Sequence, residues 1–366
     1  MMIVRSHIEA TFRLPVAARL PVAARLPVAA RLPVAAEPLT GSLKAASIVL
    51  FLTFVFVVVG AAGATAETRW AVIISGASGG EKYAEQMATW RAELRSALVD
   101  RYGFSAEHVK LLVDEAAKTG DRATAANVRD LFGEIRKAGS KEDFVLVVLL
   151  GHGTYDGDVA KFNLVGPDMT AKDWTDLLNG IQGRVAVVNT TEASFPFLEA
   201  LSSKGRIVIT ATHSAAQKYA TVFPEYFVKA MKEASTDLDK NGRTSVFEVF
   251  AAASASVKQH FEQRGQLITE HAVIDDNGDG KGRQATDEGP DGGLARIAFL
   301  DAEAVPANAT PELAALIKRR RELEAKAEEH KQLKGVMPDA EWNAQFEKLM
   351  LELAQVSAEI RKKSDK

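Results

Sequence analysis

The most reactive side chain that the sequence singles out is His152, which stands between Gly151 and Gly153 directly after the apolar run Phe144–Leu150. An imidazole titrates near neutral pH and can act as a general acid or base. The flanking glycines let the backbone turn sharply and leave space beside the ring. Asp156 follows shortly after, and its carboxylate could hold a basic ligand group or be an ordinary solvated loop residue. A histidine held by backbone hydrogen bonds is the structural alternative to a site residue.

Two hydroxyl side chains follow the predicted strand Arg184–Val188, and either could supply a nucleophile. Thr191 and Ser194 lie in the segment RVAVVNTTEAS. A hydroxyl needs an imidazole to activate it and a third group to orient that imidazole. The chain contains no cysteine, which excludes a thiolate nucleophile, disulfides and thiolate metal sites. His152 with Thr191 or Ser194 is therefore the candidate hydrolytic pair.

Short apolar runs alternate with amphipathic segments over residues 67–304, and this alternation predicts one α/β domain with a mostly parallel sheet flanked by helices. The predicted strands are Trp70–Ser75, Val109–Val113, Phe144–Leu150, Arg184–Val188, Arg206–Thr212 and Leu294–Phe299. The predicted helices are Glu81–Tyr102, Thr124–Lys137, Ala171–Leu178, Phe195–Ser202, Phe223–Glu233 and Val246–Arg264. Open α/β sheets place ligands at the carboxyl ends of their strands. His152, Thr191 and Ser194 are therefore expected at one edge of the sheet.

With these segments in view, the region Trp70–Phe299 resembles the legumain- and caspase-like cysteine peptidases. The likeness rests on LLGHG after one predicted strand, VVNTTEAS after the next, and RIVITAT in the strand that follows. The resemblance implies a caspase-like fold, often with cleavage after acidic residues or asparagine, and it aligns His152 with the family's general base. The family's nucleophilic cysteine lies in a run such as VVDxCxSG, and Thr191 takes its position here. Phe195-Pro196 stands where the family has a glycine pair.

The replacement of cysteine by threonine favours a pseudopeptidase that acts by binding or scaffolding. An unperturbed thiol ionises near pH 8.5, whereas a hydroxyl requires strong general-base help. A peptide or protein ligand is expected in the remnant cleft, and the glycines around His152 together with Asp156 are the candidate binding residues. The alternative is an active peptidase or hydrolase that uses Thr191 or Ser194 as nucleophile and His152 as base.

The segment DLDKNGRTSVFE, residues 237–248, has the spacing of an EF-hand calcium loop. Such loops need oxygen ligands at alternating positions, a glycine at the bend and a glutamate that closes the shell. Gly242 takes the bend, and predicted helices flank the segment on both sides. An acidic turn closed by glycine is the alternative. The expected Ca²⁺ ligands are Asp237, Asp239, Asn241, Arg243 through its carbonyl, Ser245 and Glu248.

A second acidic stretch, DDNGDGKG, occupies residues 275–282. Asp275, Asn277 and Asp279 fit the first three ligand positions, and Gly280 fits the bend. The twelfth position is Thr286, so the closing glutamate is missing. A partial calcium loop and a plain flexible turn fit this stretch equally.

The carboxyl-terminal region, residues 309–362, reads as an α-helical hairpin. The predicted helices Pro311–His330 and Pro338–Arg361 each carry one apolar seam and many opposite charges four residues apart. Lys334-Gly335 supplies the predicted turn. The hairpin could fold on itself or pair with a partner, and its interleaved acidic residues argue against a membrane-surface helix.

The amino-terminal region differs in composition from the rest of the chain. RLPVAA occurs four times between Arg13 and Ala36, and we expect residues 1–44 to be a disordered leader. The apolar segment 45–66 ends in small residues and predicts a signal peptide cleaved before Glu67. The alternative is an inner-membrane anchor formed by residues 45–64, the only case in which a membrane partner is expected. Either interpretation exports the α/β domain to the periplasm or the extracellular space. The net charge of −3 favours no nucleic-acid partner.

Overall fold

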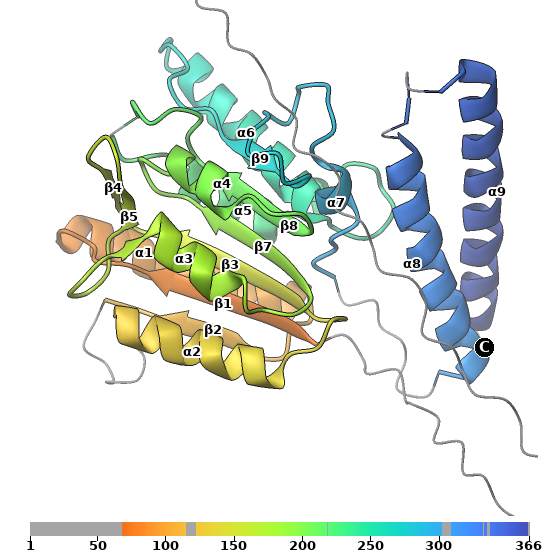
Figure 1. Ribbon diagram of the computed structural model, residues 1–366, viewed down its shortest axis with the longest axis horizontal. Helices are drawn as coiled ribbons and strands as arrows, with labels where there is room; N and C mark the ends of the chain where they lie inside the picture. The colour runs from red at the N-terminus through yellow and green to blue at the C-terminus, as the bar shows by residue number, and fades with distance from the viewer. Residues whose placement is uncertain are drawn as a thin grey trace, which may run out of the picture. The chain divides into compact units, whose positions relative to one another are not determined.

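A computed structural model describes residues 68–114, 122–217, 219–301, 309–331, 333–334 and 337–364. It confirms the predicted fold class: a mostly parallel six-stranded sheet is flanked by helices, and two further helices follow (Figure 1). The predicted leader 1–44, the signal peptide or anchor 45–66 and Gly335 of the predicted turn lie outside these residues. Among the helices in the described ranges, none is both long enough and apolar enough to cross a bilayer.

The large sheet has the strand order β2-β1-β3-β7-β8-β9. Neighbouring strands are parallel except for β9, which runs antiparallel to β8. The central strand β3 is buried along its whole length, because helices cover both of its faces and its seven residues are all apolar. The strand bounds are β1 Arg69–Ser75, β2 Val109–Leu112, β3 Phe144–Leu150, β7 Arg184–Asn189, β8 Arg206–Thr210 and β9 Val273–Asp275.

Two layers of helices cover the sheet, one on each face (Figure 1). Alternate strand residues point to opposite faces, so Val147 packs with α2, α3 and α4 while Val148 packs with α1, α5 and α6. A π-helical turn, Ala97–Arg101, extends α1. The helix bounds are α1 Glu81–Ser96, α2 Ala125–Ala138, α3 Ala171–Leu178, α4 Phe195–Leu201, α5 Phe223–Lys232 and α6 Val246–Gln263.

The last predicted strand, Leu294–Phe299, is wrong. Gly293–Arg296 forms the short helix α7, and the sheet ends instead with β9. A six-residue apolar run does not by itself distinguish a strand from a helical turn. The carboxylate of Asp276 decides the outcome, because it accepts hydrogen bonds from the amides of Gly292 and Ala295 at the start of α7. The sequence also gave no sign of a small antiparallel sheet of β4 Gly153–Tyr155, β5 Ala160–Phe162 and β6 Met169–Thr170.

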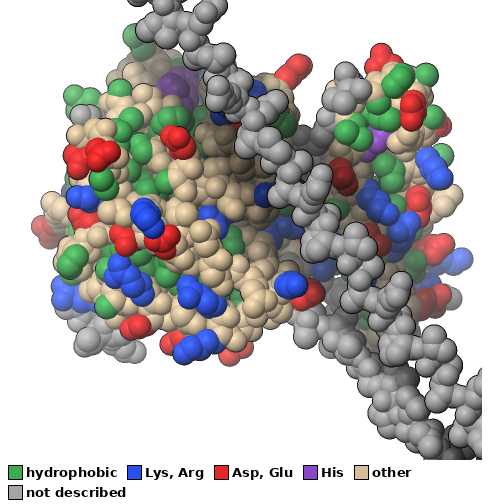
Figure 2. Space-filling model, viewed as in Figure 1, with side chains coloured by type: hydrophobic (Ala, Val, Ile, Leu, Met, Phe, Trp, Pro, Cys, Tyr) green, Lys and Arg blue, Asp and Glu red, His purple; other side chains and the backbone are tan. Residues whose placement is uncertain are grey.

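The carboxyl-terminal hairpin consists of α8 Pro311–Lys331 and α9 Asp339–Ser364, close to the predicted bounds. The indole of Trp342 donates to the carbonyl of His330, and the His330 ring Nε2 donates back to the carbonyl of Trp342, each at 2.9 Å. These reciprocal bonds lie beside the turn between the helices. The buried seam between the helices consists of Leu313, Ile317, Leu323, Val356 and Ile360. On the visible face of the hairpin, basic and acidic side chains are interspersed (Figure 2).

Candidate functional site

The carboxyl ends of β3 and β7 place the predicted site residues at one edge of the sheet. The two strands are neighbours and parallel, with Leu149 opposite Asn189, so the segments after each strand emerge together. Gly151 has φ of 144°, which favours glycine, and its backbone turns the chain toward β4. His152 therefore stands over the end of β3, next to the segment that follows β7.

Both ring nitrogens of His152 face hydrogen-bond acceptors. Nδ1 lies 2.8 Å from Oε1 of Glu192, and Nε2 lies 3.1 Å from the carbonyl oxygen of Ser78. A carbonyl and a carboxylate can only accept, so both contacts are hydrogen bonds at the same time only when both ring nitrogens carry protons. The hydrogen bond to Glu192 raises the pKa of His152 above its usual value, and partial burial opposes that rise. Tyr83 of α1 packs edge-on against the ring.

Glu192 is a candidate site residue that the sequence motifs did not single out. It lies in the same VVNTTEAS segment, immediately after Thr191, but the comparison with a peptidase motif directs attention to the hydroxyl at the cysteine position. The His152 and Glu192 side chains are only 20% and 13% exposed, so their ion pair is partly shielded from water. The sequence contained one signal for this residue. Glu192 is a carboxylate that closely follows Arg184–Val188, the predicted strand whose end was expected beside His152.

Thr191 is buried and its hydroxyl is already bonded. Its Oγ1 contacts Oδ1 of Asn189 at 2.8 Å and the carbonyl oxygen of Glu192 at 2.9 Å. A Cβ atom added at Gly153 would lie 2.6 Å from this hydroxyl, so Thr191 packs directly against the backbone of β4. In the described ranges, no hydrogen bond joins Thr191 to His152.

Ser194 is buried completely and bonds to the end of β8. Its Oγ lies 3.0 Å from the hydroxyl of Thr212 and accepts from the Thr212 amide at 3.2 Å. The hydroxyl therefore links the start of α4 to the neighbouring strand. The structure brings Thr191 and Ser194 to the same sheet edge as His152 without pairing either hydroxyl with the imidazole.

Asp156 lies in the turn between β4 and β5. Its Oδ1 accepts from the amides of Asp158 and Val159, and these bonds lower its pKa. The side chain is exposed, and its hydrogen bonds stabilise the local turn. None of its described bonds reaches His152.

An open groove of about 850 Å³ adjoins the same edge of the sheet. His213 directly follows β8, and its ring lies 4.9 Å from that of His271, which lines the groove. Burial lowers the pKa of His213, and charge repulsion with the neighbouring His271 ring lowers it further. The lining of the groove is largely apolar and includes Ala251, Ala255 and Ile268. The groove offers apolar area with a polar rim, the usual make-up of a ligand site.

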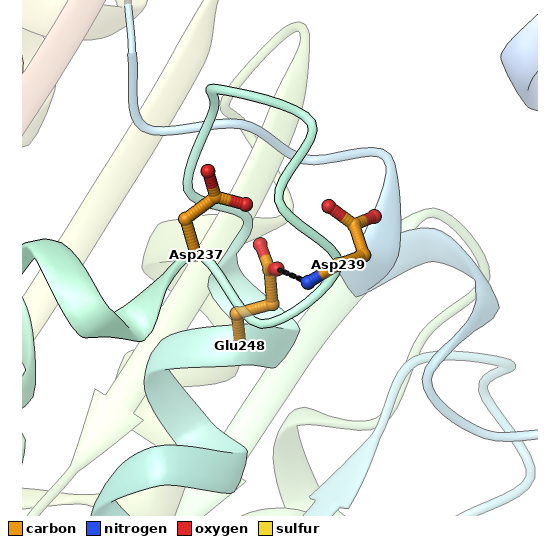
Figure 3. Close-up of side chains that lie close together, drawn as sticks. All are labelled: Asp237, Asp239 and Glu248. Carbon is orange, nitrogen blue, oxygen red and sulfur yellow. Dashed lines mark hydrogen bonds between the residues drawn. The ribbon is translucent and has the colours of Figure 1, made fainter.

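The predicted calcium loop, residues 237–248, gathers three carboxylates at the amino-terminal end of α6 (Figure 3). One oxygen each of Asp237, Asp239 and Glu248 lies within 4.8 Å of the others. Positive φ values at Lys240 and Gly242 bend the chain around the cluster. Gly242, which the EF-hand spacing assigns to the bend, is thus one of the two residues with positive φ.

Glu248 fits a metal less well than the two aspartates. Its Oε1 accepts from the amides of Leu238 and Asp239, and its Oε2 accepts from the amide and hydroxyl of Ser245. A carboxylate has about four lone-pair sites, so these bonds occupy them all. Ser245 and Glu248 form the capping box of α6, a structural reason for both residue types. Asp237 keeps free lone pairs, since each of its oxygens accepts one hydrogen bond.

The remaining predicted ligands also have other contacts. The side-chain oxygen of Asn241 accepts from the amide of Arg243. The Arg243 guanidinium lies over the Phe299 ring and contacts Glu324 of α8. Asp237 and Asp239 can thus bind a metal without rearrangement of the loop. Glu248 has to release the Leu238 and Asp239 amides before it can complete a calcium coordination shell.

Comparisons with known proteins give distant matches among solved structures. No family model and no curated protein matches the chain. Among solved structures, the chain is similar to the protein GSU0716 of Geobacter sulfurreducens, determined by structural genomics. The two share 15% identity with a TM-score of 0.39, over 57% of this chain and 92% of that one.

Proposed function

We propose that the α/β domain is a legumain/caspase-like pseudopeptidase that binds a peptide or protein segment and does not cleave it. The observation that carries the proposal is the state of His152. A general base needs a nitrogen lone pair within reach of the proton that it removes. Both nitrogens of this ring face fixed acceptors, Glu192 and the Ser78 carbonyl, and we infer that both carry protons, which leaves neither lone pair available to a substrate.

The hydroxyl groups support the same conclusion. Thr191 and Ser194 are buried and bonded to neighbouring protein groups, so a substrate carbonyl cannot approach either oxygen without rearrangement of the strand ends. A nucleophile and its base must lie within hydrogen-bond reach of one another. The caspase-like assignment itself rests on the three sequence motifs and on the meeting of two of them at one sheet edge.

The groove beside His271 is the proposed seat of the ligand. Its apolar lining suits aliphatic side chains, and the imidazolium of His152 with Glu192 offers both charges at the neighbouring strand ends. Glu192 follows β7, and His213, which follows the neighbouring strand β8, contacts His271, so an extended peptide laid across these strand ends would reach both surfaces. Gly151 and Gly153 have no side chains, so nothing projects from the backbone on either side of His152.

A selection from a random nonapeptide phage library on purified full-length protein tests the proposal. We expect enriched peptides whose binding falls at least tenfold in a Glu192→Gln variant and is unchanged in Glu134→Gln, a matched loss of one carboxylate on an exposed surface of α2. Incubation of the same peptides with the wild-type protein should leave them intact. Absence of enrichment, or equal binding by the two variants, would contradict the proposed ligand site.

The rival proposal is a hydrolase that uses Thr191 or Ser194 with His152. Its supporting observation is that all three residues lie at one edge of the sheet. A fluorophosphonate probe distinguishes the two, since it labels only activated hydroxyls. Labelling of either residue that disappears in His152→Ala would establish the rival proposal, and we expect no labelling.

Calcium at residues 237–248 stays a separate proposal, supported by the carboxylate oxygens of Asp237 and Asp239. Full-length protein stripped with chelator should unfold at a lower temperature than the protein with excess Ca²⁺. The difference should shrink in a double variant, Asp237→Asn with Asp239→Asn. A thermal unfolding midpoint that is equal with and without Ca²⁺ would contradict calcium binding by this loop.

Export and self-association are the remaining proposals. They rest on the apolar segment 45–66 and on the long hairpin helices α8 and α9. Fractionation of the native host, with mass spectrometry of the mature amino terminus, tests export and cleavage before Glu67. Sedimentation of the purified chain tests pairing of the hairpin with a second copy.

A further inference from the structure

A second acidic cluster lies at the end of β9, where the sequence shows an incomplete calcium loop. One carboxylate oxygen each of Asp275, Asp279 and Asp291 lies within 4.8 Å of the others. Both oxygens of Asp275 accept backbone bonds at 2.9 Å, from Gly278 and Gly280, so the chain curls around this carboxylate. Asp291 is twelve residues beyond Asp279 and outside any loop spacing that the sequence suggested.

Reciprocal bonds with Asp276 bring Asp291 into the cluster. The Asp276 amide donates to Oδ1 of Asp291 at 3.2 Å. The Asp276 carboxylate in turn accepts from the amides of Gly292 and Ala295, each at 2.8 Å. The segment around Asp291 is thereby fixed to the loop from both sides, and Asp291 takes the place of the missing closing glutamate.

The second oxygen of Asp291 is a buried acceptor without a hydrogen bond. The Asp291 side chain is 1% exposed, and its Oδ2 accepts no hydrogen bond. Arg283 Nε lies 3.2 Å away, but neither this nitrogen nor Oδ2 makes a hydrogen bond there. Buried carboxylate oxygens are costly unless a donor or a metal ion contacts them. The three clustered carboxylates carry more negative charge than the one guanidinium paired with Asp291 can offset.

We propose that Asp275, Asp279 and Asp291 bind a divalent cation, with calcium as the favoured ion. The donors are all oxygens, and a loop that curls around its first carboxylate suits the larger, flexibly coordinated Ca²⁺ better than Mg²⁺. The contrast with the first loop is direct: Glu248 has no lone pair left, whereas Oδ2 of Asp291 accepts no hydrogen bond and has Arg283 Nε as an ion-pair partner at 3.2 Å. This inference stands independently of the proposed binding function.

Equilibrium dialysis of chelator-stripped full-length protein against Ca²⁺ tests the site. We expect a bound ion whose affinity falls at least tenfold in Asp291→Asn and in Asp279→Asn. Asp279 is exposed, so its variant keeps the test valid where Asp291→Asn fails to fold. The matched control is Asp287→Asn, an exposed aspartate outside the cluster whose carboxylate accepts from the Gln284 amide. Its affinity should equal that of the wild type.

The double variant Asp237→Asn with Asp239→Asn distinguishes binding at the two loops, because it should retain the ion bound at the end of β9. Complete loss of Ca²⁺ binding in that double variant, or no Ca²⁺ binding by the wild type, would overturn the proposal. Arg283→Gln gives a further check. We expect it to bind Ca²⁺ at least as tightly as the wild type, because a competing positive charge is removed. A variant that binds no Ca²⁺ would make Arg283 a required part of the cluster and would refute the proposal as stated.

Discussion

The ion pair between His152 and Glu192 predicts that loss of the Glu192 charge destabilises the protein more at low pH than at high pH. We consider the substitution Glu192→Gln, which keeps the shape of the side chain and removes its charge. Both partners are mostly shielded, at 20% and 13% exposure, and Nδ1 lies 2.8 Å from the carboxylate. Hydrogen bonds to charged groups contribute about 1.5–3 kcal/mol, and partial exposure reduces this, so we expect a loss of about 1–2 kcal/mol.

The sign follows from the raised pKa of His152. A group whose pKa is higher in the folded state stabilises that state fully below its unfolded value, about 6.5, and the contribution is lost as pH rises through the folded value. The wild type should therefore exceed Glu192→Gln in free energy of unfolding by more at pH 6 than at pH 8.5.

Urea denaturation at the two pH values measures the difference, with Glu134→Gln on an exposed surface of α2 as the matched control. That control should unfold like the wild type at both pH values. A Glu192→Gln effect that is equal at pH 6 and pH 8.5, or larger at pH 8.5, would refute the imidazolium assignment.

Three further predictions concern packing, capping and the altered nucleophile position. Gly153→Ala should cost about 1–3 kcal/mol in urea denaturation, because its Cβ would lie 2.6 Å from the Thr191 hydroxyl; Gly133→Ala, with open space around it, should not destabilise the protein. Ser245→Ala should cost about 1 kcal/mol in the same assay through loss of the α6 cap, and no change would argue against the capping box. Thr191→Cys should remain inactive on peptides and react slowly with iodoacetamide, since the site is buried; rapid alkylation would contradict the described packing.

The sequence predicted the sheet well because its strands are apolar on both faces. Phe144–Leu150 could only be a strand or a short buried helix, and the adjoining glycines favoured the strand. The predicted helix Ala171–Leu178 has the same bounds in the structure, where Thr170 and Asp173 form its capping box. Leu294–Phe299 failed because a distant carboxylate, Asp276, stabilises a helical turn there.

The candidate site was predictable in its location and not in its contacts. Parallel neighbours bring His152 and Thr191 to the same edge, which strand order alone can suggest. Side-chain directions after a strand depend on the turn geometry, and they send the Glu192 carboxylate to the imidazole while the Thr191 hydroxyl turns inward. Likewise, no spacing rule connects Asp291 with Asp275, because the link between them is a pair of tertiary hydrogen bonds.

The protonation state of His152 is the point on which the noncatalytic account depends most. Nitrogen-15 NMR of histidine-labelled protein, titrated from pH 5 to pH 9, observes both ring nitrogens of this residue. We predict a His152 pKa above 6.5, with protons on both nitrogens at pH 6.5, and a lower pKa in Glu192→Gln. A neutral ring with an unprotonated nitrogen at pH 6.5, or a pKa that Glu192→Gln leaves unchanged, would contradict the account.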